Sequence, residues 1–159
     1  MKVLPDASPA DLVPLHANSF TLPQGLIGFA HYTRAELLYL PDHLPFLWMK
    51  LHSPTDSVHF IVIEPAGLVQ GYEPELFDED AAALGLADPS EAMVLNVVTL
   101  QNQRPIEATV NLVGPIIVNR RTRIGRQLVV ANYFRYSAHH PLVENAAPAA
   151  PSFSTRASA

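Results

Sequence analysis

Proline is the residue that most constrains how this chain can fold. The 159 residues include 15 prolines, about twice the usual frequency, and they are spaced along the whole chain. Proline lacks a backbone N–H and clashes with the preceding helical turn, so this spacing excludes long helices. The chain is therefore predicted to fold from short strands joined by turns.

Six segments between the prolines have the composition of strands. They are rich in Val, Ile, Leu and aromatic residues and are bounded by Pro, Gly, Asp or Asn. These segments are residues 36–40, 46–52, 58–64, 92–100, 109–119 and 126–131. Several are apolar on both faces, which is typical of strands buried on both sides. We expect a mainly β fold, a small antiparallel β-barrel-like single domain with one or two short helices.

Two short helices are predicted from signals at their ends. Three acids at 78–80 precede an alanine run, and carboxylates favour a helix start by accepting free amide hydrogens and by opposing the positive end of the helix dipole. Gly85 is expected to end this helix. A second, one-turn helix is expected to begin at Asp88, with Pro89 in its first position.

The two ends of the chain differ in composition from its centre. Residues 1–11 lack the apolar segment of a secretory signal, and residues 144–159 are rich in Ala, Pro and Ser without periodicity. We expect a loose N-terminal segment at 1–15, one domain at 16–143 and a flexible tail at 144–159. Since no stretch is long and apolar enough to cross a bilayer, we expect a cytoplasmic protein with no membrane partner.

Charge is segregated along the chain, whose net charge is -5. Residues 64–91 hold eight acids and no Lys or Arg, whereas residues 108–143 hold five arginines and no acid. The middle third is therefore predicted to present a negative surface. Four of the arginines lie within residues 120–126, which indicate a basic hairpin turn.

No residue pattern points to a catalytic or metal site. The chain has no cysteine, which excludes disulfides and thiolate ligands, and its seven histidines have no ligand spacing. We predict no catalytic residue, no cofactor and no metal. Two alternatives stay open: a small β-barrel metal- or ligand-binding enzyme that uses histidines and acids, and direct binding of RNA by residues 120–126.

A series of short motifs follows a fixed order along the chain. In the first half they are FTLPQGLIGF at 20–29, PFLW at 45–48 and IEP at 63–65. In the second half they are YEPEL at 72–76, TVNLVGPIIVN at 109–119, TRIG at 122–125 and YSAHHPL at 136–142. Together these motifs resemble the FliW family of flagellar assembly factors. The resemblance covers residues 20–142, and the run 110–125 is its most specific part.

The resemblance implies a non-enzymatic regulator whose partners are proteins. FliW-like proteins are β-barrel-like and bind two partners in turn, the RNA-binding translational repressor CsrA and flagellin. Flagellin retained in the cytoplasm occupies FliW and leaves CsrA free to repress flagellin translation. Export of flagellin releases FliW to capture CsrA. The implied role is therefore that of a chaperone and translation regulator in flagellum assembly, without direct contact with nucleic acid.

Eight residues are the candidates for partner binding. The acids are chosen because a negative surface attracts a basic RNA-binding dimer and repels RNA phosphates. The other three lie in the motifs that carry the resemblance. The candidates are Glu73, Glu75, Asp78, Glu79, Asp80, Arg123, Tyr136 and His140.

Overall fold

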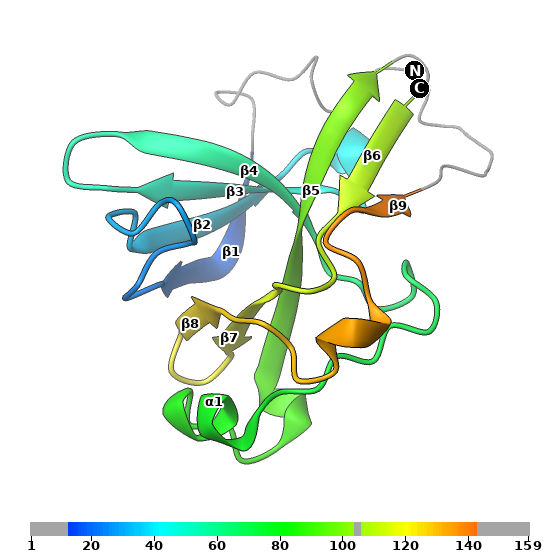
Figure 1. Cartoon of the computed structure of the whole chain (residues 1–159). Coiled ribbons are helices and arrows are strands. Elements are labelled where there is room, and N and C mark those ends of the chain that lie inside the picture. The colour runs from blue at the N-terminus through cyan, green and yellow to red at the C-terminus, as the bar shows by residue number, and fades with distance from the viewer. Residues whose placement is uncertain (1–12, 104–105, 143–159) are drawn as a thin grey trace.

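The computed structural model describes residues 13–103 and 106–142, which hold nine strands in one sheet (Figure 1). The strands are β1 (Val13–Thr21), β2 (Arg34–Tyr39), β3 (Leu47–His52), β4 (Ser57–Ile63), β5 (Ala92–Gln103), β6 (Ile106–Val110), β7 (Ile116–Asn119), β8 (Ile124–Gln127) and β9 (His140–Leu142). Their order is β4-β3-β2-β1-β8-β7-β5-β6-β9, and β4 also pairs with β5. That pairing closes a seven-stranded barrel, from which β6 and β9 extend. The predicted mainly β, barrel-like fold is confirmed.

The barrel interior is built by the alternation that a pleated strand imposes. In β3, Leu47, Met49 and Leu51 are buried while the residues between them are partly exposed. In β7 all four residues are buried, because one face lines the barrel and the other packs against Leu84 and Leu86, which directly follow α1 (Asp78–Ala83). The apolar runs that predicted strands buried on both sides are therefore explained by a second layer over part of the barrel.

The single strand predicted at 109–119 is wrong, because β6 ends at Val110 and β7 begins at Ile116. Between them the Asn111 side-chain oxygen accepts hydrogen bonds from the backbone N–H groups of Val113 (3.0 Å) and Gly114 (2.9 Å). An asparagine that bonds to the backbone two and three residues ahead turns the chain locally. This turn interrupts the ladder although the surrounding sequence is apolar.

The strand predicted at 126–131 lies two residues earlier, as β8. Beyond it the chain still follows the β6–β7 connection, because Leu128 N–H donates to the Pro115 carbonyl and Val130 N–H to the Val113 carbonyl, both at 3.1 Å. These bonds hold residues 128–130 against the irregular connection between β6 and β7. An alternating strand pattern in the sequence does not predict such a pairing.

The N-terminal strand β1 begins inside the segment 1–15 that the sequence places before the domain. Its first two residues pair with β2, Val13 opposite Tyr39 and Pro14 opposite Leu38. Its last residue, Thr21, pairs with β8 and closes the barrel through one parallel contact. The expected tail at 144–159 lies outside the described residues, as do residues 1–12.

Both short helices are confirmed, with one correction to how the first begins. The N-cap of α1 is Phe77, and no side chain makes a capping hydrogen bond there. The acids at 78–80 therefore do not cap the helix by accepting its amides, and they stabilise it only through the helix dipole. The second helix is a 3-10 turn, Pro89–Glu91, whose capping box joins Asp88 and Glu91.

Candidate functional site

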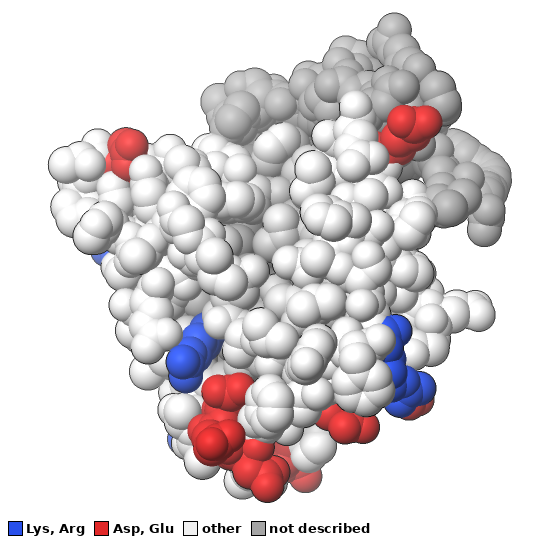
Figure 2. Space-filling model, viewed as in Figure 1, with Lys and Arg blue, Asp and Glu red and all other residues white. Residues whose placement is uncertain are grey.

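Acidic side chains gather at the end of the molecule where α1 lies (Figure 2). We call this surface the acidic end and define it by residues 73–80 together with Asp88 and Glu91. Glu73, Glu75, Asp78 and Glu79 are exposed there, and Asp80 is partly buried. Five of the eight predicted partner residues thus lie on one stretch of surface.

The helix at the acidic end stops abruptly for a local reason. Gly85 has a φ of +68°, and the N–H groups of Gly85 and Leu86 donate to the carbonyls of Ala82 and Ala81. This bonding pattern is the Schellman motif, which favours glycine at the left-handed position. It directs Leu86 back under the helix, where it packs with Leu84.

The segment that carries Glu73 and Glu75 is held by one buried asparagine. The Asn132 amide donates to the Glu73 carbonyl (2.9 Å) and accepts from the Glu75 N–H (3.0 Å), and Ala131 N–H donates to the Glu75 carbonyl (2.6 Å). Asn132 is 5% exposed. Its side-chain amide therefore supplies the backbone hydrogen bonds that a neighbouring β-strand would otherwise make with this segment. No local sequence pattern distinguishes Asn132 from other asparagines, so this role was not predicted.

Tyr136 lies beside this segment and fixes its start. Its hydroxyl accepts a hydrogen bond from the Glu73 N–H at 2.9 Å, and its ring stacks edge-on against Tyr72 with centroids 4.9 Å apart. Tyr72 in turn donates to the Leu112 carbonyl at 2.8 Å, and burial raises the pKa of this phenol. Tyr136 therefore lies beside the predicted acids, and it positions the backbone of Glu73.

The basic hairpin between β7 and β8 faces the acidic end. Arg126 lies 3.9 Å from Asp80, and Arg121 lies 4.0 Å from Glu91. These long, solvent-exposed pairs stabilise the fold little, but they reduce the net charge of the surface. Two runs of opposite charge that are segregated in the sequence are thus neighbours in space, which leaves the hairpin less suited to RNA.

The remaining two candidates lie elsewhere. Arg123 sits at the hairpin tip against β1, where its backbone carbonyl accepts from the Thr21 N–H at 2.9 Å. His140 opens β9 and pairs with Val110, on the extension outside the barrel. The structure therefore brings together six of the eight predicted residues and separates these two from them.

An apolar groove of about 470 Å³ runs between α1 and the strands behind it. Its apolar walls come from Leu76 and Leu86 on one side and from Val94 and Ile117 on the other, while Glu75 and Asp88 add carboxylates. Its other lining residues are Pro74, Ala81, Ala87, Pro89 and Ala92. The acidic end therefore borders a concave apolar surface, which the sequence did not predict.

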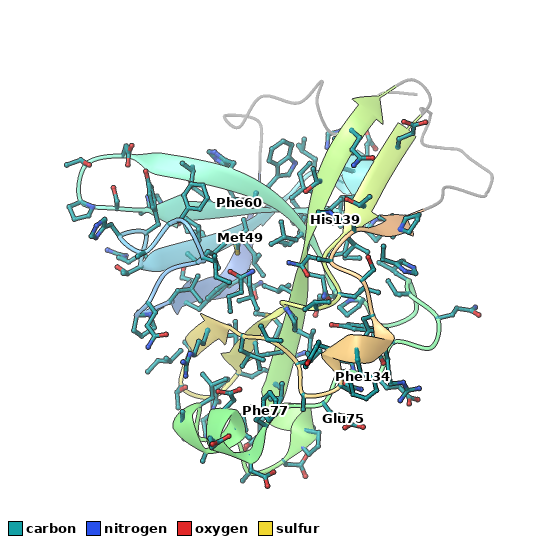
Figure 3. All side chains as sticks on the ribbon, viewed as in Figure 1. Met49, Phe60, Glu75, Phe77, Phe134 and His139 are labelled. Atoms are coloured by element: carbon teal, nitrogen blue, oxygen red, sulfur yellow. The ribbon has the colours of Figure 1, made fainter. Side chains whose placement is uncertain are left out.

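Exposed aromatic side chains lie near this region. Phe134 is 77% exposed and Tyr133 is 52% exposed, and their rings meet edge-on at 6.0 Å. Phe77, next to the start of α1, is 43% exposed (Figure 3). The 3-10 turn that holds the pair, Tyr133–Arg135, directly follows Asn132, which binds the acidic segment. Adjacent aromatics are equally typical of a core, so the sequence could not identify them as surface residues.

Within residues 13–103 and 106–142, no three His, Asp or Glu side chains are grouped so that they could hold a metal ion. In the same part of the chain, no helix has the length and apolar character needed to span a membrane.

Comparison with known proteins gives one consistent result. The family model described as FliW protein matches residues 12–142. The flagellar assembly factor FliW of Natranaerobius thermophilus is 36% identical over 122 residues, which cover 77% of this chain and 80% of that protein. The FliW of Geotalea uraniireducens is 36% identical over 124 residues, covering 77% and 73%. A crystal structure of the flagellar assembly factor FliW superposes with a TM-score of 0.69 at 26% identity, covering 85% of this chain and 93% of that one.

Proposed function

Since this chain belongs to the FliW family of flagellar assembly factors, we propose that it is a non-enzymatic regulator of flagellum assembly that acts in the cytoplasm. It binds and antagonises a CsrA-type translational repressor, and it alternately binds flagellin. The two partners compete for it, so flagellin that has not been exported releases the repressor, and export of flagellin restores its capture.

The observation that carries this proposal is the acidic end beside an apolar groove. A CsrA-type protein binds RNA and therefore displays positive charge, which the exposed carboxylates of Glu73, Glu75, Asp78 and Glu79 complement. Complementary charge steers association, and apolar surface in the groove supplies contact area that excludes water. The same carboxylates repel RNA phosphates from the bound repressor.

The test is a calorimetric titration of the full chain with the CsrA homologue of the same genome. We expect submicromolar binding with a defined stoichiometry, and we expect monomeric flagellin to lower the apparent affinity when it is added first. If the chain binds flagellin but not CsrA, its role would be that of a flagellin chaperone and not that of a translation regulator. Binding of neither protein would overturn the proposal.

A further inference from the structure

Tyr133 and Phe134 form an exposed aromatic pair on the surface of the protein. Their rings meet edge-on, and each side chain is more than half exposed. Single apolar side chains are common on protein surfaces, whereas adjacent exposed aromatic rings mark sites where another surface docks. The pair is therefore a candidate for contact with a partner.

The turn that carries the pair is held in place at both ends. Before it, the buried Asn132 side chain is hydrogen-bonded to the backbone of residues 73–75. After it, the Tyr136 ring stacks on Tyr72. Two backbone hydrogen bonds of 3.1 and 3.0 Å close the 3-10 turn Tyr133–Arg135 itself. Because the backbone is fixed, the pair loses little conformational freedom when a partner binds.

Negative charge lies next to the pair. Ala131 N–H donates to the Glu75 carbonyl at 2.6 Å, so the acidic segment runs beside the residues that precede the pair. Figure 3 shows Glu75, Phe77 and Phe134 on the same face of the protein. Four carboxylates of the acidic end make no ion pair with any described residue, namely those of Glu73, Glu75, Asp78 and Glu79. They outnumber the single cation of the turn, Arg135, so this face suits a basic partner.

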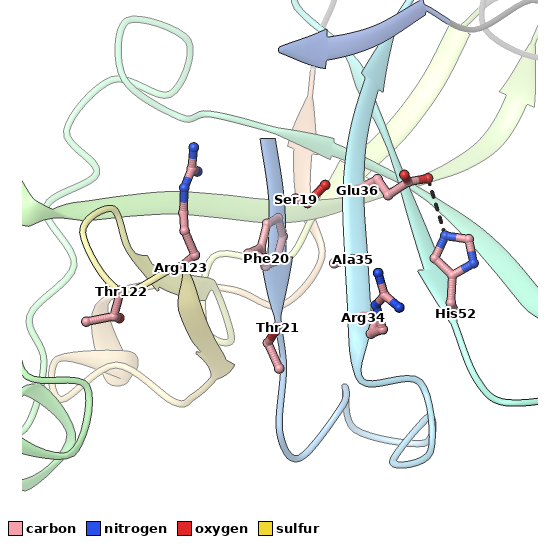
Figure 4. A pocket seen from close by; sticks show the side chains of 9 residues that line it. All are labelled: Ser19, Phe20, Thr21, Arg34, Ala35, Glu36, His52, Thr122 and Arg123. Carbon is pink, nitrogen blue, oxygen red and sulfur yellow. Dashed lines mark hydrogen bonds and ion pairs between the residues drawn. The ribbon is translucent and has the colours of Figure 1, made fainter. Parts of the chain in front are cut away.

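Positive charge predominates at another part of the surface. A polar pocket beside the tip of the β7–β8 hairpin is lined by Arg34 and Arg123 (Figure 4). The one acid among its lining residues, Glu36, already lies 3.3 Å from His52. None of these lining residues belongs to the acidic end. A basic partner is therefore repelled from this pocket and directed to the acidic end, where the aromatic pair lies.

We propose that Tyr133 and Phe134 are the apolar anchors that hold a basic, RNA-binding protein partner after the acidic end has attracted it. This inference rests on the proposed function and assigns contact residues to its repressor. The two parts of the surface act at different stages of binding. Attraction between opposite charges raises the association rate, whereas removal of water from the two rings slows dissociation.

The test measures the association and dissociation rates of the full chain with the CsrA homologue of the same genome, by surface plasmon resonance at two salt concentrations. We expect Phe134→Ser and Tyr133→Ser each to raise the dissociation rate about tenfold or more and to change the association rate by less than about twofold. Asp78→Lys with Glu79→Lys should give the opposite pattern, a slower association that depends less on salt.

The matched control is Ile27→Ser, since Ile27 is as exposed as Phe134, at 77%. It lies on the loop between β1 and β2, which Figure 1 shows on the opposite side of the view from the turn Tyr133–Arg135. This control should associate and dissociate at the rates of the parent protein. All three serine variants replace exposed side chains, so their urea midpoints should equal that of the parent.

Each outcome separates this inference from the proposed function. If the parent binds CsrA and both aromatic variants dissociate at the parent's rate, the inference is wrong and the proposed function stands. An equal effect of Ile27→Ser also overturns the inference, because any exposed apolar side chain would then serve. Loss of flagellin binding with unchanged CsrA binding would assign the pair to flagellin and overturn its assignment to the repressor. If the parent does not bind CsrA, the proposed function fails and this inference fails with it.

Discussion

The side-chain amide of Asn96 donates a hydrogen bond of 2.8 Å to the backbone carbonyl of Asn111. Asn96 is fully buried in β5, and Asn111 lies where β6 ends. The same amide nitrogen lies 3.2 Å from the Tyr72 hydroxyl. The buried Asn96 side chain therefore connects β5 by hydrogen bonds to the break between β6 and β7 and to Tyr72, whose ring packs on Tyr136.

We predict that Asn96→Ala lowers the free energy of unfolding by about 1–3 kcal/mol, because it leaves the part-buried Asn111 carbonyl without its donor. The measurement is urea denaturation of both proteins. Thr99→Ala, an exposed position on the same strand, is the control and should change stability by less than about 0.5 kcal/mol. Equal losses in the two variants would contradict the structural role of the Asn96 amide.

We predict that Tyr136→Phe speeds hydrogen exchange at the Glu73 amide, because that N–H loses its acceptor while the ring stacked on Tyr72 is kept. Stability should fall by about 0.5–1.5 kcal/mol, the usual contribution of one hydrogen bond. The Leu86 amide, bonded to Ala81 in the helix cap, is the internal control and should exchange as before. Unchanged hydrogen exchange at the Glu73 amide would refute the hydrogen bond between this N–H and the Tyr136 hydroxyl.

We predict that Gly25→Ala is far more harmful than Gly28→Ala. Both glycines have positive φ, +61° and +86°, but a methyl group at Gly25 would collide with the Phe29 carbonyl, whereas nothing lies within 4 Å of one at Gly28. The second change should cost about 1 kcal/mol and the first on the order of 3 kcal/mol, measured by thermal or urea unfolding. Similar losses of stability in the two variants would show that the turn at Gly25 relaxes to accommodate the methyl group.

We predict that the stability of the protein falls as the pH drops below about 6.5, in part through His59. Burial, then the charges of Lys50 and His52, lower the pKa of this imidazole. The unfolded chain therefore binds the proton more tightly, and the contribution of His59 is lost as the pH falls through its folded pKa. Urea midpoints should fall less steeply with decreasing pH in His59→Gln than in the parent protein, and equal slopes would contradict this role of His59.

We predict that reversing the charge of all five acids, Glu73, Glu75, Asp78, Glu79 and Asp80, to lysine weakens antagonism of CsrA binding to RNA by tenfold or more, since it removes the complementary field. The measurement is RNA release from CsrA at fixed salt. Asp78→Lys with Glu79→Lys, two of the five changes, is compared with Asp42→Lys with Glu107→Lys, two exposed acids outside this surface, because both double variants change the net charge equally. Unchanged antagonism after the fivefold reversal would exclude the acidic end as the contact.

Local signals predicted the helices well and the strand ends poorly. The capping residues of the 3-10 turn, Asp88 and Glu91, act over three residues, so their pattern is visible in the sequence. The apolar run from 109 to 119 predicted one strand, because its composition cannot show that Asn111 bonds to the backbone ahead of it and ends β6. The acids of the candidate surface were also visible in the sequence as a charged run, whereas the groove beside them was not.

Proline spacing, apolar periodicity and helix-end residues were sufficient to predict a small, mainly β, barrel-like domain with short helices, because each acts over a few neighbouring residues. Contacts between distant segments were decided only by tertiary packing. Asn132 holds the acidic segment and Arg126 approaches Asp80 because the closure of the barrel brings their strands and loops together. Such pairings depend on register and closure, which no short stretch of sequence encodes.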